Sequence, residues 1–225
     1  MSPQFGGEGA RVRSGLERVL FCFAVEQEAK FVSKPGREIL ITGIGRENAE
    51  RSLRRAMKQR PPQLVLSCGF AGGLNPMLAS GTVVFSTDED AGLSPALLAA
   101  GACPVRFHCS DRVATTAEEK RSLWETTGAD AVEMESGIIR AFCRTQGIPS
   151  ATLRVISDAA QETLPLDFNV FMTADQKLNY GKLILALLGS PRKIPAILRL
   201  QRQTQRAAKN LAQVLSEVIP GGESR

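Results

Sequence analysis

Short apolar runs alternate with amphipathic segments along most of the chain. The runs typical of buried strands are residues 18–24, 38–42, 64–68, 82–86, 105–109, 131–133 and 151–156. Segments with apolar residues at helical spacing lie between these runs. They are a short segment that begins at about Glu26 and residues 48–58, 116–126 and 136–146. This alternation predicts an α/β fold with a mostly parallel central sheet.

Three regions of the chain differ in composition. Residues 1–15 are Gly-rich and lack the apolar core of a signal peptide, so we expect a flexible N-terminal arm. Residues 16–190 carry the strand and helix pattern and are predicted to form one domain. Residues 191–225 are predicted to form a basic helical extension packed on that domain. No run reaches the roughly 20 apolar residues that would span a bilayer, so we expect a cytoplasmic protein.

Composition removes several classes of function. Aromatic residues make up only 5% of the chain, and the net charge of +5 is not accompanied by a nucleic-acid-reading motif, so we expect no nucleic-acid partner. The five cysteines include no CxxC pair, which indicates buried thiols in a reducing compartment. His108 is the only histidine, which excludes a multi-histidine metal site. We therefore expect neither a metal nor a cofactor.

Acidic residues and glycine-rich turns follow the predicted strands. Glu28, Glu135 and Asp158 each come shortly after a strand, and the turns at residues 43–45 and 69–73 follow two others. Ligands of open parallel sheets bind beyond the carboxyl ends of the strands. The pattern predicts a site for acid–base chemistry there. The alternative for each acid alone is a partner for a helix dipole, and for each glycine a tight turn.

Paired carboxyl groups suit the cleavage of a glycosidic bond. The transition state resembles an oxocarbenium ion, so one group must assist the departing base and another must activate the nucleophile. Asp158 follows an apolar strand and is expected to be partly desolvated. Glycosidic cleavage by these acids is therefore our first functional hypothesis.

Five motifs in this order resemble the nucleoside phosphorylase superfamily, in its methylthioadenosine/adenosylhomocysteine nucleosidase branch. They are residues 24–29 (AVEQEA), 43–45 (GIG), 69–74 (GFAGGL), 132–136 (VEMES) and 154–158 (RVISD). The resemblance covers about residues 18–160. It implies a single domain of three α/β/α layers around a mixed, mostly parallel sheet, and a homodimer. Residues 71–76, 134–136 and 191–200 are most similar to the hopanoid-associated phosphorylase group, thought to release adenine from adenosylhopane.

The resemblance also implies roles for individual residues. Glu28 would activate the attacking water, Glu135 would bind the ribose hydroxyls, and Asp158 would protonate or hydrogen-bond N7 of the purine. The other residues implied to bind substrate are Glu133, Met134, Ser157, Gly69, Phe70, Ala71, Val113 and Ala114.

Departures from the family pattern leave the nucleophile open. Phe70 replaces a small hydroxyl residue, and Ser67 stands where phosphorylases often carry a phosphate-binding arginine. Both changes favour water, whereas Arg46 could still contact phosphate. The segment 87–104, which helps to shape the pocket in the family, is short. Three hypotheses remain: a hydrolase acting on a 5′-substituted purine nucleoside, most simply an adenine one; a phosphorylase; and an inactive nucleoside-binding protein.

The C-terminal region is basic and helical in pattern. Its cationic residues are Arg192, Lys193, Arg199, Arg202, Arg206 and Lys209, and its apolar ones include Ile194, Leu198, Leu211 and Leu215. One interpretation is a terminal helix packed on the sheet with a solvated basic face. The other is a peripheral contact with anionic lipid at the inner membrane surface, which would suit a lipid-linked nucleoside substrate.

Overall fold

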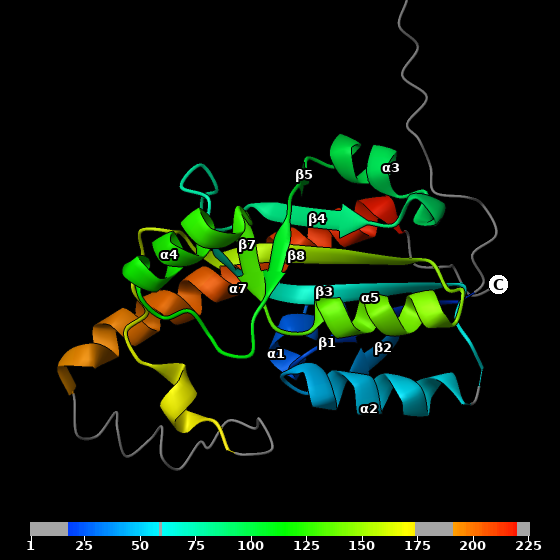
Figure 1. Cartoon of the computed structure of the whole chain (residues 1–225), viewed down its shortest axis with the longest axis horizontal. Coiled ribbons are helices and arrows are strands. Elements are labelled where there is room, and N and C mark those ends of the chain that lie inside the picture. The colour runs from blue at the N-terminus through cyan, green and yellow to red at the C-terminus, as the bar shows by residue number, and fades with distance from the viewer. Residues whose placement is uncertain (1–17, 59, 174–190, 220–225) are drawn as a thin grey trace, which may run out of the picture.

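The computed structural model describes residues 18–58, 60–173 and 191–219 (Figure 1). Its strands are β1 (Val19–Phe23), β2 (Glu38–Ile41), β3 (Leu64–Gly73), β4 (Val83–Thr87), β5 (Cys103–Pro104), β6 (Phe107–Cys109), β7 (Ala131–Glu133) and β8 (Ser150–Asp158). Its α-helices are α1 (Glu26–Ala29), α2 (Arg46–Met57), α3 (Ser94–Ala99), α4 (Ala117–Thr127), α5 (Ser136–Thr145) and α7 (Ile194–Val218). Short 3-10 helices are η1 (Glu89–Ala91), η2 (Phe168–Phe171) and η3 (Pro191–Lys193).

The strands form one mixed sheet. Its main order is β2-β1-β3-β8-β4-β5, and the first four of these strands are mutually parallel. Strand β4 runs antiparallel to β8, and β7 pairs antiparallel with the end of β3 while β6 joins its other side. The predicted mixed, mostly parallel sheet is confirmed.

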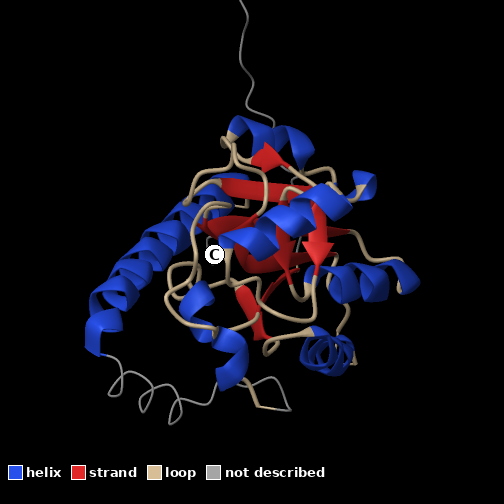
Figure 2. Cartoon of the chain, turned by 60° about the vertical axis from the view of Figure 1, so that its left-hand side comes forward, coloured by secondary structure: helices blue, strands red, loops and turns tan. Residues whose placement is uncertain are grey.

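Helices cover both faces of the sheet, which makes three layers (Figure 2). Helices α2 and α5 pack on one face, where Leu53 and Ile139 meet Cys22 and Val65. The C-terminal half of α7 packs on the other face together with α3, and its Leu211 and Leu215 belong to the largest core cluster. The α/β/α architecture expected from the resemblance is confirmed.

Two local predictions are wrong. Residues 105–109 were expected to form one strand, but the chain makes β5 and β6 with Val105 and Arg106 between them. Glu135 was expected at the carboxyl edge of a parallel sheet, but β7 runs antiparallel to β3, pairing Val132 with Gly72. Glu135 therefore reaches the site as the residue that begins α5, where the chain reverses after β7.

Helix α7 has two different halves. Its C-terminal half is buried against β8, β3 and β4, whereas its N-terminal half extends beyond the sheet (Figure 1, orange). None of the helices in the described ranges is long and apolar enough to cross a membrane. The predicted arm 1–15 lies outside the described residues, and the division into 16–190 and 191–225 stays a prediction.

Candidate active site

The turn after β1 buries Glu28. Helix α1 begins with a capping arrangement in which the Glu28 carboxylate accepts hydrogen bonds from the backbone N–H of Ala24 (3.0 Å) and Val25 (3.3 Å). Its other oxygen accepts a hydrogen bond from the N–H of Phe70 on β3, at 2.8 Å. Glu28 is 6% exposed, and burial raises its pKa against the opposing effect of Arg154. A buried carboxylate with a raised pKa is a stronger base than an exposed one.

Arg154 lies at the centre of the acidic cluster and is 1% exposed. Its Nη2 donates to Glu133 at 2.7 Å and to Ser67 Oγ at 3.1 Å, and lies 3.5 Å from Glu135. Burial alone would lower the pKa of Arg154, but Glu133, Glu135 and Glu28 together raise it. The guanidinium is therefore a permanent cation that holds three carboxyl groups together.

Glu133 is the structural partner of Arg154. Its carboxylate also accepts hydrogen bonds from Ser136 N (2.7 Å), Ser136 Oγ (2.8 Å) and Glu135 N (3.0 Å). Burial works to raise the pKa of Glu133, but Arg154 and Ser136 outweigh it and lower that pKa. Glu133 thus stays ionised and fixes the turn that presents Glu135.

Glu135 has a different environment from Glu133, two residues before it. Its Oε1 accepts one hydrogen bond, from Gly45 N at 2.8 Å. Burial, opposed by Arg154 and reinforced by Glu133, raises the pKa of Glu135 to about 7. This carboxyl group therefore changes its charge near neutral pH and can exchange hydrogen bonds with a ligand.

Gly69 is what allows these groups to meet. Its φ is +146°, and a Cβ there would lie 2.6 Å from both Arg154 Nη1 and Glu28 Oε1. Any side chain at this position of β3 would separate the carboxylate from the guanidinium. The glycine predicted to approach a ligand closely also makes room for the side chains that surround it.

Asp158 forms a second group at the end of β8. Its Oδ1 accepts a hydrogen bond from Ser157 Oγ at 2.5 Å, and the same hydroxyl lies 3.2 Å from the carbonyl oxygen of Ala71. Its Oδ2 forms an ion pair with the ammonium of Lys120 on α4. Asp158 is buried, and its charge is opposed by a buried cation.

The two groups lie apart along β8. Arg154 and Asp158 are four residues apart on that strand, or about 13 Å at the rise of an extended chain. The glycine-rich end of β3 pairs beside this stretch, with Gly69 opposite Arg154 and Gly72 opposite Asp158. An extended ligand of nucleoside size can therefore contact the glutamates at one end and Asp158 at the other.

Three other residues predicted to bind substrate lie in different surroundings. The backbone of Val113 is held by the side chain of Asn169 on η2 through hydrogen bonds of 2.9 and 3.0 Å. Ala114 packs in a small core cluster with Leu74 and Val132. Met134 is half-buried in the turn between Glu133 and Glu135.

Arg46 is not joined to the Arg154 cluster in the described structure. Its side chain is 55% exposed and lies 3.5 Å from Asp111, which belongs to the loop before α4. An exposed pair of this kind contributes little to stability. Arg46 therefore stands at the surface between the glycine turn and the loop, and contacts none of the buried acids.

Sequence reasoning missed three residues of this arrangement: Arg154, Lys120 and Asn169. Arg154 was visible as a charged residue inside an otherwise apolar strand, which is a signal for a buried ion pair. Lys120 and Asn169 carry no such signal, because each sits in a segment of ordinary polarity. Among the described residues, no group of three or more His, Cys, Asp or Glu side chains is arranged to hold a metal ion.

Known structures share this fold. The nucleosidase for 5′-methylthioadenosine and S-adenosyl homocysteine from Campylobacter jejuni superposes with a TM-score of 0.65 at 16% identity, covering 88% of this chain and 96% of that one. The futalosine hydrolase of Helicobacter pylori gives 0.65 at 16% identity, covering 91% and 97%. The Neisseria meningitidis nucleosidase in complex with methylthio-immucillin-A gives 0.64 at 19% identity, covering 91% and 99%.

The sequence itself matches a family model. The model of the phosphorylase superfamily aligns with residues 26–108 and 102–189, which include both groups of acids. This match confirms the predicted enzyme class, a nucleosidase or nucleoside phosphorylase, at the level of the family. The chain belongs to the phosphorylase superfamily.

Proposed function

We propose that this protein hydrolyses the N-glycosidic bond of a purine nucleoside, with adenine as the base and a substituent at the 5′ position. The observation that carries the proposal is the presence of two buried acidic groups, one around Arg154 and one at Asp158, two residues that are about 13 Å apart along β8 at the rise of a strand. One group would act on the sugar and the nucleophile, and the other on the base. The structural neighbours named as nucleosidases and as a hydrolase support this class of reaction.

Glu28 is assigned to the nucleophile. Its carboxylate lies beside Arg154 and the N–H of Phe70, so a water between these groups could be oriented by the donors and deprotonated by the acid. Glu135 accepts a hydrogen bond from Gly45 N through Oε1, and its other oxygen is assigned to the ribose hydroxyls. The same oxygen can stabilise positive charge that develops on the sugar.

Asp158 is assigned to the leaving base. Cleavage puts negative charge on the departing purine. The protonated carboxyl group of Asp158 relieves that charge by donating a hydrogen bond or its proton to N7, which leaves Asp158 as a carboxylate. The Ser157 hydroxyl lies within hydrogen-bond distance of Asp158 Oδ1 and of the carbonyl oxygen of Ala71 on β3, so it holds one oxygen of Asp158 in place. Val113, which the resemblance implies to bind substrate and whose backbone Asn169 holds, would contact the purine.

Electrostatics favour water over phosphate. Three carboxyl groups surround Arg154, and its guanidinium already bonds Glu133 and Ser67. A phosphate dianion at this position would meet more negative than positive charge in a poorly screened site. The other candidate for a phosphate contact, Arg46, is exposed and pairs with Asp111.

Release of free base tests the proposal. Purified protein is incubated with 5′-methylthioadenosine, S-adenosylhomocysteine, adenosine and inosine, with and without inorganic phosphate. The free base and a free sugar should appear at the same rate in both conditions. A strict need for phosphate, with a sugar 1-phosphate as product, would establish phosphorolysis instead.

Two substitutions test the assigned roles. Glu28→Gln and Asp158→Asn should each lower kcat on 5′-methylthioadenosine by roughly 10²- to 10⁴-fold. Glu26→Gln is the matched control, because Glu26 lies on the same short helix and is exposed. If wild-type protein releases no base from any of these nucleosides yet binds them in calorimetry, the chain is a nucleoside-binding protein.

The identity of the 5′ substituent forms the finer part of the proposal. The proposed substrate is a lipid-linked adenine nucleoside, which would bring the enzyme to a membrane surface as a peripheral protein. We propose that the enzyme acts there as a homodimer. Supporting this, Ile194 and Leu198 are 42% and 45% exposed on the outer half of α7, next to basic residues of that helix. A groove of about 830 Å³ beside them is lined by Arg199, Arg202 and Arg206.

A further inference from the structure

Lys120 is a charged side chain with no exposed surface. We infer that it is a positioning residue for the reaction, holding the Asp158 carboxylate in the orientation that serves the leaving base. The inference rests on the proposed function, since it assigns Lys120 a part in the step given to Asp158. Nothing in the sequence pattern sets Lys120 apart from the other lysines.

The ammonium of Lys120 has three partners. It donates hydrogen bonds to the carbonyl oxygens of Ala159 (2.9 Å) and Glu162 (2.8 Å), and it pairs with Asp158 Oδ2. The two hydrogen bonds use two of the three ammonium protons, and Asp158 is held by the ion pair, without a third hydrogen bond. A buried cation is strongly destabilising unless partners of this kind surround it, so the position of the ammonium is well defined.

Helix α4 presents Lys120 in one direction. The helix begins with a capping box in which Thr116 Oγ1 accepts from Glu119 N (3.1 Å) and the Glu119 carboxylate accepts from Thr116 N (3.1 Å). Lys120 is the next residue, so its backbone is fixed by this cap. The start of α4 is also tied to the loop after β8, because Ala117 N donates to Thr163 Oγ1 at 3.2 Å.

The opposite side of that loop is held by α7. Gln203 Nε2 donates to the carbonyl oxygen of Ser157 (3.0 Å) and to the Glu162 carboxylate (2.8 Å). The same carboxylate accepts from Ala159 N at 3.0 Å. The turn that follows Asp158 is therefore clamped between α4 and α7, with the Lys120 ammonium inside it.

Both oxygens of Asp158 have a neighbouring side chain beside them. Ser157 Oγ donates a hydrogen bond to Oδ1, and the Lys120 ammonium forms an ion pair with Oδ2. Without Lys120 the carboxyl group could rotate about its last torsion, and the carboxylate that remains after Asp158 gives its proton to the base would have no cation beside it. The consequence is specific: departure of the base should suffer, whereas activation of the nucleophile should not, because Glu28 lies beside Arg154, four residues before Asp158 on β8.

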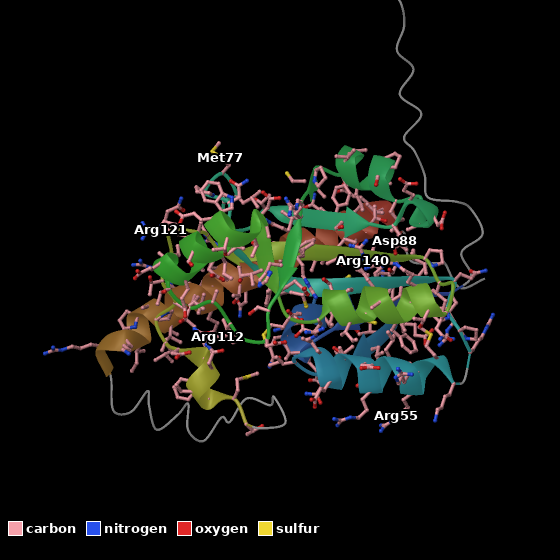
Figure 3. All side chains as sticks on the ribbon, viewed as in Figure 1. Arg55, Met77, Asp88, Arg112, Arg121 and Arg140 are labelled. Carbon is pink, nitrogen blue, oxygen red and sulfur yellow. The ribbon has the colours of Figure 1, made fainter. Side chains whose placement is uncertain are left out.

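Two substrates separate these effects. Cleavage of 5′-methylthioadenosine needs help at the base, whereas p-nitrophenyl β-D-ribofuranoside loses nitrophenolate without a proton. Lys120→Met, which keeps the length of the side chain, should lower kcat on the nucleoside about 10- to 100-fold. KM should change less than threefold, and kcat on the nitrophenyl riboside should also change less than threefold. Arg121→Met on the outer side of α4 is the matched control and should match wild type on both substrates (Figure 3).

A double variant guards against a folding defect. Lys120→Met/Asp158→Asn removes both charges, so no unpaired carboxylate stays buried. Because Lys120 acts through Asp158, the double variant should be no less active on the nucleoside than Asp158→Asn alone. A further tenfold loss in the double variant would contradict the inference.

The outcomes distinguish this inference from the proposed function. If Asp158→Asn fails to discriminate between the two substrates, the leaving-group role of Asp158 is wrong, and the inference falls with it. If Asp158→Asn discriminates while Lys120→Met keeps full activity or loses it equally on both substrates, the role of Lys120 alone is overturned.

Discussion

At the scale of single residues, the environment of each carboxyl group separates the roles of the acids. Glu133 and Glu135 are two positions apart, yet Arg154 and Ser136 lower the pKa of the first, while burial raises that of the second to about 7. Burial also raises the pKa of Glu28. Acids whose environments drive their pKa values apart are typical of groups with distinct tasks. Here one glutamate is a fixed anion and two can gain or lose a proton.

Glu135 should make the protein less stable as the pH rises. A carboxyl group whose folded pKa lies above its unfolded value contributes stability below about pH 4.5, and that contribution is lost as the pH rises through about 7. The difference between about 7 and 4.5 corresponds to roughly 3 kcal/mol at most. Glu135→Gln should therefore raise the free energy of unfolding at pH 8.5 relative to wild type, more than at pH 5. Urea unfolding of wild type and Glu135→Gln at both pH values measures the difference, with Glu26→Gln as the control. An equal change in the free energy of unfolding at pH 5 and pH 8.5 would contradict the prediction.

Gly69→Ala should damage both stability and activity. The new Cβ would lie 2.6 Å from Arg154 Nη1 and Glu28 Oε1, in addition to the strain of a positive φ. Gly92→Ala is the matched control, because its φ is also positive (+64°) and no atom lies within 4 Å of a Cβ there. We expect a loss of about 1 kcal/mol for Gly92→Ala and about 3 kcal/mol or more for Gly69→Ala. Thermal unfolding and base release are measured for both variants. Equal losses of stability in the two would show that the space around Gly69 is not tight enough to exclude a methyl group.

Sequence patterns drew attention to acids that sit in local motifs and missed their partners, and the roles assigned to those acids stay predictions. Glu28, Glu135 and Asp158 are visible because each follows an apolar run at short distance. Arg154 meets Glu133 and Glu135 because β3, which pairs with both β7 and β8, brings these segments together. Lys120 meets Asp158 although the two residues are 38 positions apart in the chain. Such pairings depend on tertiary packing, which the hydrophobic pattern does not encode.

At the scale of elements, the hydrophobic pattern predicted which strands exist better than it predicted their direction in the sheet. The strands β1, β2, β3, β4 and β8 were all expected from their apolar runs. The antiparallel direction of β7 was not, because a three-residue strand has too few positions to favour either neighbour. That direction matters for the site, since it turns the chain back so that Glu135 begins α5 beside the Gly45 turn.

The C-terminal half of α7 should behave as core. Leu211 and Leu215 are fully buried with the sheet residues, whereas Leu198 is 45% exposed. Leu211→Ala and Leu215→Ala should each lower the free energy of unfolding by about 2 to 5 kcal/mol. Leu198→Ala should change it by about 0.5 kcal/mol or less. Chemical unfolding of the three variants tests this, and a small effect of Leu211→Ala would show that α7 detaches without cost.

At the scale of the whole molecule, α7 connects the core to an outer surface. One end of the helix completes the hydrophobic core, its middle ties down the loop after Asp158 through Gln203, and its other end carries exposed Ile194 and Leu198 (Figures 1 and 2). Deleting the chain after Ser190 would therefore unfold the domain and say nothing about a membrane. Point substitutions on the outer end are the appropriate test of a surface contact.

Neutralising the outer arginines of α7 should weaken binding to anionic vesicles. Each Lys or Arg near an anionic surface contributes about 1 kcal/mol, so the triple change of Arg199, Arg202 and Arg206 to Gln should reduce the partition coefficient roughly 100-fold. The matched control carries the same loss of charge on α2 and the residue after it, at the exposed Arg51, Arg55 and Lys58. Arg55 is labelled in Figure 3. This control should bind within a few-fold of wild type after correction for net charge. Sedimentation with phosphatidylglycerol vesicles at about 0.05 and 0.5 M salt measures both, because screening should abolish the difference at the higher concentration. Equal binding of the two triple variants, or binding to neutral phosphatidylcholine vesicles alone, would show that this end of α7 is a solvated face and that the substrate need not be held in a membrane.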